Sequence, residues 1–118
     1  MARILVIDDE PQIRRMIHRA LASLHHSVFE AQDGEEGLEV LERERPAVVI
    51  TDILMPNREG IETITAIRRT SAAVKIIAIS GGTFYLSAAK KLGADAVLSK
   101  PFRAEDLIDT VDRLLASL

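Results

Sequence analysis

The sequence predicts a single α/β domain over residues 1–118, built on a doubly wound parallel β-sheet. Short continuous apolar runs, typical of strands buried on both faces, recur along the chain. Segments with helical spacing of apolar residues separate these runs. A length of 118 residues and a hydrophobic content of 47% suit one folded domain and argue against disorder.

The first half of the chain shows this alternation clearly. Strands are expected over residues 3–7, 27–31 and 47–51. The first helix should begin at Pro11, because proline is favoured in the first turn, with Asp9 or Glu10 as its N-cap. Its apolar face consists of Ile13, Met16, Ile17, Ala20, Leu21 and Leu24. The second helix follows the turn at residues 33–34, carries Leu38 and Leu41, and ends before Pro46.

The second half repeats the pattern. Gly60 precedes a third helix, and strands are expected over residues 75–79 and 95–98. Between these strands a short fourth helix ends near Leu92, because Gly93 follows it. The last helix has an apolar face made of Leu107, Ile108, Val111, Leu114, Leu115 and Leu118.

Strands that alternate with helices form a parallel sheet through right-handed crossovers. We expect the strand order 2-1-3-4-5, in which the direction of winding reverses between the first and third strands. In such sheets, ligands bind outside the carboxyl ends of the strands, at this reversal. A functional site is therefore expected at that edge.

Composition excludes several classes of function. The net charge of −3 argues against nucleic-acid binding as the main activity. The absence of cysteine excludes disulfides, thiolate catalysis and zinc–thiolate sites. The N-terminal apolar run spans only residues 4–7, too short for a signal peptide or a membrane span, so we expect a cytoplasmic protein that does not contact membranes.

Five side chains that carry chemistry follow the apolar runs directly. They are Asp8, Asp9, Asp52, Ser80 and Lys100. Taken singly, each has an ordinary interpretation as a helix cap, a turn residue or a solvated lysine. Because all five fall at the carboxyl ends of strands, their combination indicates a site for a divalent cation and a phosphoryl group.

The residue types suit that chemistry. An aspartate can attack phosphorus and form an aspartyl phosphate, and Asp52 is the predicted nucleophile. Asp8 and Asp9 would help to bind Mg²⁺, or alternatively Mn²⁺, through oxygen, with Asp52 as a further ligand. Lys100 would pair with a phosphoryl oxygen, and the hydroxyl of Ser80 would donate to another.

The chain resembles the receiver domain of two-component response regulators over nearly its whole length. The resemblance is carried by the segments Ile-Leu-Val-Ile-Asp-Asp-Glu-Pro at 4–11, Asp-Gly at 33–34, Val-Val-Ile-Thr-Asp-Ile-Leu-Met-Pro at 48–56, Glu-Gly-Ile-Glu at 59–62, Gly-Ala-Asp-Ala at 93–96 and Leu-Ser-Lys-Pro-Phe at 98–102. It implies a flavodoxin-like (βα)5 fold.

The resemblance also implies roles for single residues. Asp52 would accept a phosphoryl group from a histidine kinase or a histidine phosphotransfer protein. Asp9 and Asp52 would bind Mg²⁺ directly, together with the main-chain carbonyl of Leu54, and Asp8 would act largely through water. Ser80 and Lys100 would sense the phosphoryl group and thereby switch the binding of a downstream protein. We expect a stand-alone domain, monomeric or weakly dimeric, that is not a turnover enzyme.

Two features depart from the family pattern. The family usually carries Tyr or Phe three residues before the lysine, where this chain has Val97. The stretch from Ser80 to Gly93 is also shorter than is common. Phe84 and Tyr85 lie in this stretch and, with Val97, are candidates for the output face; packing of the shortened helix is the competing interpretation.

Two other functions are open on the sequence alone. An aspartyl-phosphate hydrolase similar to the haloacid dehalogenases would need an Asp-x-Asp motif, but here Asp8 and Asp9 are adjacent and Pro11 follows. A receiver-like interaction module that is never phosphorylated would explain Val97, but not the presence of all five site residues.

Overall fold

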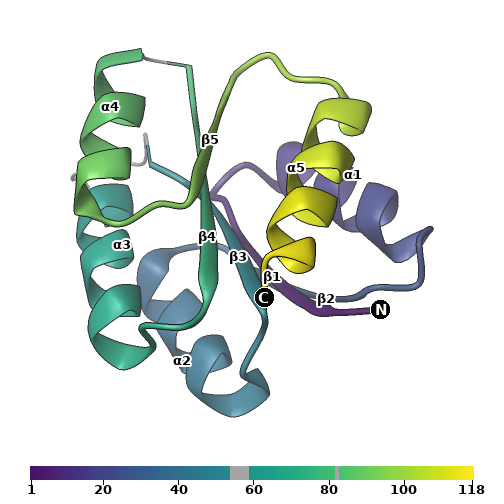
Figure 1. Cartoon of the computed structure of the whole chain (residues 1–118), viewed down its shortest axis with the longest axis horizontal. Coiled ribbons are helices and arrows are strands. Elements are labelled where there is room, and N and C mark those ends of the chain that lie inside the picture. The colour runs from purple at the N-terminus through teal and green to yellow at the C-terminus, as the bar shows by residue number, and fades with distance from the viewer. Residues whose placement is uncertain (54–58, 82) are drawn as a thin grey trace.

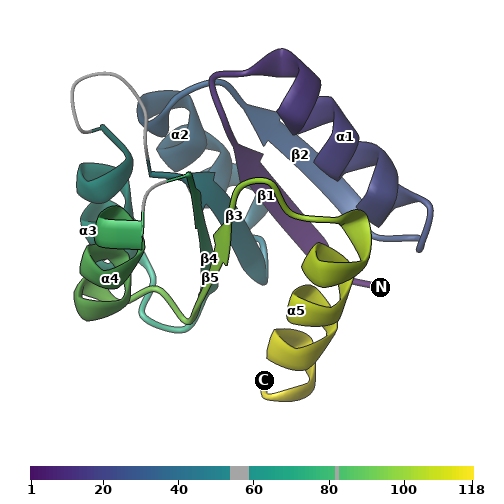
Figure 2. The same cartoon turned by 90° about the horizontal axis from the view of Figure 1, so that it is seen from above.

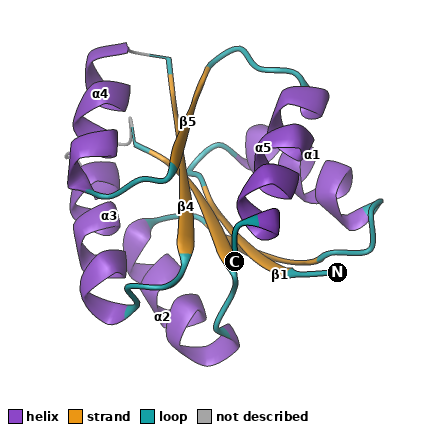
Figure 3. Cartoon of the chain, in the orientation of Figure 1, coloured by secondary structure: helices purple, strands orange, loops and turns teal. Residues whose placement is uncertain are grey.

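The computed structural model describes residues 1–53, 59–81 and 83–118. Within them, five parallel strands form one sheet in the order β2-β1-β3-β4-β5 (Figures 1 and 3). The strands are β1 (Arg3–Ile7), β2 (Ser27–Ala31), β3 (Val48–Asp52), β4 (Lys75–Ser80) and β5 (Ala96–Ser99). The helices are α1 (Pro11–Ala22), α2 (Gly34–Glu44), α3 (Glu59–Thr70), α4 (Thr83–Leu92) and α5 (Ala104–Ala116). The predicted α/β fold and strand order are confirmed.

Helices cover both faces of the sheet. Figure 2 shows α1 and α5 on one side and α2, α3 and α4 on the other. Alternate strand residues therefore belong to two separate cores, because successive side chains of a strand point to opposite faces. On β1, Leu5 and Ile7 pack toward α2 and α3, whereas Ile4 and Val6 pack toward α1 and α5. Burial on both faces explains why the strands are continuous apolar runs.

The boundaries of three strands differ from the predicted ones by one residue. β3 begins one residue later than expected and includes Asp52, β4 extends to Ser80, and β5 covers 96–99 instead of 95–98. At the ends of two helices, apolar residues expected on the buried face are instead exposed: Leu24 is 42% and Leu118 is 67% exposed. Both lie beyond the last helical turn, so helical periodicity no longer directs them toward the core.

The helix starts show which caps form. Asp33 is the N-cap of α2, and its carboxylate accepts a hydrogen bond from the backbone N–H of Glu36. At α1 the N-cap is Glu10, with Pro11 following it, and no side-chain hydrogen bond caps the helix. Of the two predicted N-caps, Asp9 and Glu10, the structure therefore shows Glu10. The Glu10 backbone N–H instead donates to Asp8, which draws Asp8 into the turn between β1 and α1.

The opposite end of the sheet is held by Arg68 of α3. Its guanidinium donates to the carbonyl oxygens of Ala72, Val74 and Gly93, and to the carboxylate of Asp95 at 2.6 Å. Asp95 in turn accepts a hydrogen bond from the Ile76 backbone N–H. This arginine links the end of α3 to the segments that enter β4 and β5, at the edge of the sheet opposite the carboxyl ends.

Candidate functional site

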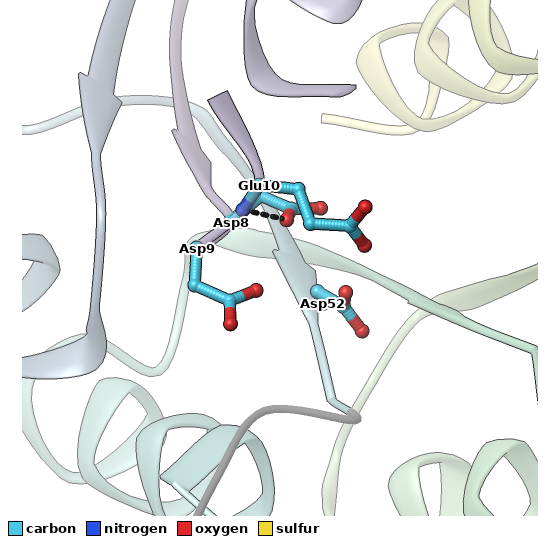
Figure 4. Close-up of side chains that lie close together, drawn as sticks. All are labelled: Asp8, Asp9, Glu10 and Asp52. Carbon is cyan, nitrogen blue, oxygen red and sulfur yellow. Dashed lines mark hydrogen bonds between the residues drawn. The ribbon is translucent and has the colours of Figure 1, made fainter. Parts of the chain in front are cut away.

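Pairing of the central strands brings the predicted carboxylates together. Ile7 of β1 lies beside Thr51 of β3, so Asp8, directly after β1, and Asp52, at the end of β3, emerge at the same edge. Only 1% of Asp8 and 2% of Asp52 is exposed to solvent, whereas Asp9 is exposed. Figure 4 shows these three carboxyl groups with that of Glu10, and one ligand oxygen from each lies within 4.8 Å of the others.

Asp8 is held by one oxygen and leaves the other without a hydrogen bond. Its Oδ1 accepts a hydrogen bond from the Glu10 backbone N–H at 2.8 Å (Figure 4). Its Oδ2 is buried and has no hydrogen-bond partner among the residues that the structure describes. Burial raises the pKa of Asp8 from 3.8 to about 6, and the negative charge of Asp52 adds to this effect. A buried carboxylate oxygen with this environment is suited to a bound cation.

Lys100 is the cation of the site. Its Nζ lies 2.7 Å from Oδ2 of Asp52, 3.4 Å from Oε1 of Glu10 and 3.8 Å from Oδ2 of Asp8. Partial burial disfavours the charged amine, but the hydrogen bond and charge of Asp52 outweigh it and raise the pKa of Lys100 above 10.5. The lysine therefore stays protonated and is positioned to pair with negative charge at Asp52.

Lys100 directly follows β5, and its backbone is hydrogen-bonded to the end of the neighbouring strand β4. The Lys100–Pro101 peptide bond is cis, and the Lys100 backbone N–H donates to the carbonyl oxygen of Ser80 at 2.9 Å. Ser80 is fully buried at the end of β4, one residue beyond Ile79, which pairs with Asp52. The ends of β3, β4 and β5 thus lie side by side at the edge predicted from the sequence.

The other predicted residues have different outcomes. Leu54 lies outside the described residues, as do the side chains of Phe84 and Tyr85. Val97 is half-buried and packs against the core on the side of α3 and α4. Its proposed part in an output face stays a prediction.

Glu10 is a site residue that sequence reasoning missed. The sequence predicts only a helix cap at Glu10, but the carboxylate of Glu10 joins the acidic cluster and pairs with Lys100. Its position directly after two aspartates was the available signal. Whether it points toward the site depends on the turn at Asp8, which the sequence did not define.

The residues at this edge fit a hard divalent cation. All the cluster ligands are carboxylate oxygens, which Mg²⁺ prefers. The buried Asp8 Oδ2 lacks a hydrogen-bond donor from the described residues, as expected for an oxygen that interacts with a cation or its bound water. Asp8, Asp9 and Asp52 are therefore candidates to hold the ion, and Glu10 lies within reach of them.

Comparisons with known proteins identify the family. The family model for the response regulator receiver domain matches residues 4–112. Response regulator MprA of Mycolicibacterium vanbaalenii is 35% identical over 115 residues, which cover 96% of this chain and 50% of MprA. The probable transcriptional regulator ycf27 of Porphyridium aerugineum is 36% identical over 107 residues, covering 89% of this chain and 44% of that protein. This chain therefore spans about half the length of these curated relatives.

A solved structure agrees with this assignment over the whole fold. Chemotaxis response regulator CheY4 of Vibrio cholerae superposes with a TM-score of 0.89 at 33% identity, covering 97% of this chain and 98% of CheY4. No helix in the described part of the chain is long and apolar enough to cross a membrane. Because the family model matches most of the sequence and CheY4 shares its complete fold, this chain belongs to the response regulator receiver domain family.

Proposed function

We propose that this receiver domain accepts a phosphoryl group on Asp52, in a Mg²⁺-dependent reaction, from the histidine of a kinase or of a phosphotransfer protein. The observation that carries the proposal is the environment of Asp52: a buried carboxylate, with two further aspartates beside it and the Lys100 ammonium 2.7 Å away. Membership of a phosphoryl-accepting signalling family supports it. The family assignment also favours a receiver over the phosphohydrolase alternative.

Each residue has a defined part in the proposed transfer. A carboxylate oxygen of Asp52 attacks phosphorus, a new O–P bond forms as the N–P bond of the donor breaks, and the imidazole leaves with its electron pair. Lys100 exchanges its contact with the Asp52 oxygen for one with a phosphoryl oxygen. Ser80, at the neighbouring strand end, donates its hydroxyl to another phosphoryl oxygen.

The cation would be bound by Asp9 and Asp52, with Asp8 acting through water and the Leu54 carbonyl as a further ligand. When bound, Mg²⁺ would neutralise the clustered carboxylates and the charge of the phosphoryl oxygens. Without a cation, the clustered carboxylates repel one another, and only Lys100 provides an opposing charge among the contacts described at the site.

Phosphorylation is proposed to switch the binding of a downstream protein. It adds negative charge beside Lys100 and Ser80, which can bias the segments that follow β4 and β5. We also propose that the domain is monomeric or weakly dimeric and acts in the cytoplasm without binding nucleic acid. One relative is named a probable transcriptional regulator and is about twice as long, so the proposal about nucleic acid applies to this domain alone.

The proposal is tested by the intact mass of the protein after incubation with an acyl phosphate. Wild-type protein should gain one phosphoryl group in the presence of Mg²⁺ and none in excess chelator. Asp52→Asn should gain none under either condition. Asp112→Asn, the same substitution on the exposed surface of α5, should behave as the wild type. A folded wild-type protein that gains no mass would refute the proposal and favour the unphosphorylated interaction module.

A further inference from the structure

Arg14 of α1 holds the main chain at Asp8 from outside the acidic cluster. Its Nη1 donates to the Asp8 carbonyl oxygen at 2.7 Å, while the Asp8 backbone N–H donates to the carbonyl of Ala31 in β2. The Asp8 side chain is fixed separately, by the Glu10 N–H. Hydrogen bonds therefore hold three groups of Asp8: its carbonyl, its amide and one carboxylate oxygen. The other carboxylate oxygen, Oδ2, has no hydrogen bond from the described residues.

Arg14 is itself held by Glu30, which also contacts His18, and both residues lie outside the site. Its Nε donates to Oε1 of Glu30 in β2 at 2.8 Å, and Nδ1 of His18 lies 2.6 Å from the other oxygen of Glu30. Partial burial disfavours ionisation of Glu30, but the hydrogen bonds and charges of Arg14 and His18 outweigh it and lower the pKa of Glu30. Only 15% of the Arg14 side chain is exposed, so its guanidinium has little freedom to leave this arrangement.

We propose that Arg14, oriented by Glu30, is a positioning residue that sets the affinity of the acidic cluster for Mg²⁺. The Asp8 carbonyl belongs to the peptide that joins Asp8 to Asp9, so its direction fixes how both carboxylates enter the cluster. A rigid set of ligands binds a metal more tightly than a mobile one, because less ordering is needed on binding. This inference rests on the proposed Mg²⁺ site.

The sign of the effect separates positioning from charge. Arg14 is a cation near a cation site, so loss of its charge alone would strengthen Mg²⁺ binding. Positioning predicts the opposite, because loss of the guanidinium frees the Asp8–Asp9 peptide. Arg14→Met should therefore weaken Mg²⁺ binding, by about tenfold for the loss of a residue that orients metal ligands. Arg14→Lys, which keeps the charge but cannot bridge both partners, should weaken it as well.

The experiment is a titration of MgCl2 into ¹⁵N-labelled protein, with dissociation constants fitted from amide chemical shifts. Arg3→Met is the matched control. Arg3 is also paired with a glutamate, Glu44, but lies at the far end of β1. Its replacement removes the same charge and should not weaken binding. Glu30→Gln should weaken binding less than Arg14→Met. Hydrogen exchange of the Glu10 amide, measured without metal, should be faster in Arg14→Met than in Arg3→Met.

Equal or tighter Mg²⁺ binding by a folded Arg14→Met would overturn the inference. If that variant does not fold, Arg14→Lys decides: unchanged affinity overturns the inference, and weaker affinity at unchanged thermal stability supports it. Wild-type protein that binds no Mg²⁺ would count against the proposed function instead. In that case, exchange of the Glu10 amide still decides whether Arg14 holds the turn.

Discussion

Replacing Asp8 by asparagine is expected to stabilise the metal-free protein. The Asp8 side chain is ionised at neutral pH, is 2% exposed, and has an oxygen without a hydrogen-bond donor among the described residues. Asparagine has nearly the same shape, and its Oδ1 can accept the hydrogen bond from the Glu10 N–H. Its uncharged amide group would replace the buried negative oxygen, next to the Asp52 carboxylate.

The size of the effect follows from the pKa of Asp8. Burial raises this pKa from 3.8 to about 6. At a pH above both values, keeping the folded protein ionised at Asp8 costs about 3 kcal/mol relative to the unfolded chain. Asp8→Asn should therefore raise the free energy of unfolding at pH 7.5 by up to about 3 kcal/mol.

The pH dependence gives a second, independent check. Because the folded pKa is raised, the contribution of Asp8 to stability is fully present below pH 3.8 and is lost as the pH rises through about 6. The advantage of Asp8→Asn should accordingly shrink from about 3 kcal/mol at pH 7.5 to about 1 kcal/mol at pH 4.5. The comparison with wild type at each pH cancels the titration of carboxylates that lie far from the site.

Urea unfolding followed by far-ultraviolet circular dichroism, with excess chelator, measures these differences. Asp9→Asn is the control, since Asp9 is exposed and its substitution should change stability less. Addition of Mg²⁺ at about 100 times its dissociation constant should stabilise the wild type by about 2.7 kcal/mol and Asp8→Asn by less. Equal stability of wild type and Asp8→Asn at pH 7.5, or a difference that does not vary with pH, would refute the reasoning.

Three further predictions concern parts of the fold outside the site. A Cβ at Gly37 of α2 would overlap Cδ1 of buried Ile7. Gly37→Ala should therefore destabilise the protein by about 1–3 kcal/mol in urea unfolding, although alanine favours helices, and a gain in stability would contradict this. Arg68→Met should lower the free energy of unfolding by about 2–3 kcal/mol, because carbonyl and carboxylate acceptors lose their donor. Arg69→Met, at an exposed position of the same helix, should lower it little. Similar melting temperatures for the two variants would argue against the link between α3, β4 and β5. Burial, followed by the charge of the N-terminal amine, lowers the pKa of His26 below 6.5. The contribution of His26 to stability is therefore present above pH 6.5 and is lost as the pH falls through the pKa of the folded state. His26→Gln should flatten this part of the profile of unfolding free energy against pH.

The sequence alone determined the fold and the place of the site. Apolar runs alternating with amphipathic helices leave few topologies, because crossovers between parallel strands are right-handed. Once the sheet is parallel, the residues that end its strands must share one edge. Asp8, Asp52 and Lys100 could therefore be predicted to lie together without knowledge of any contact. In the structure, Nζ of Lys100 lies within 4 Å of a carboxylate oxygen of both aspartates.

Tertiary structure alone decided which atoms of those residues are paired. Asp8 has one oxygen bound to its own turn and one buried without a hydrogen bond, a difference that arises from the direction of a single peptide. Glu10 and Arg14 reach their partners through long side chains, and their directions depend on rotamers set by neighbouring elements. The spacing of residues along the chain fixes where each backbone position lies, but not where the end of a flexible side chain makes its contact. The arrangement around Asp8 could therefore be known only once β1, β2 and α1 had packed together.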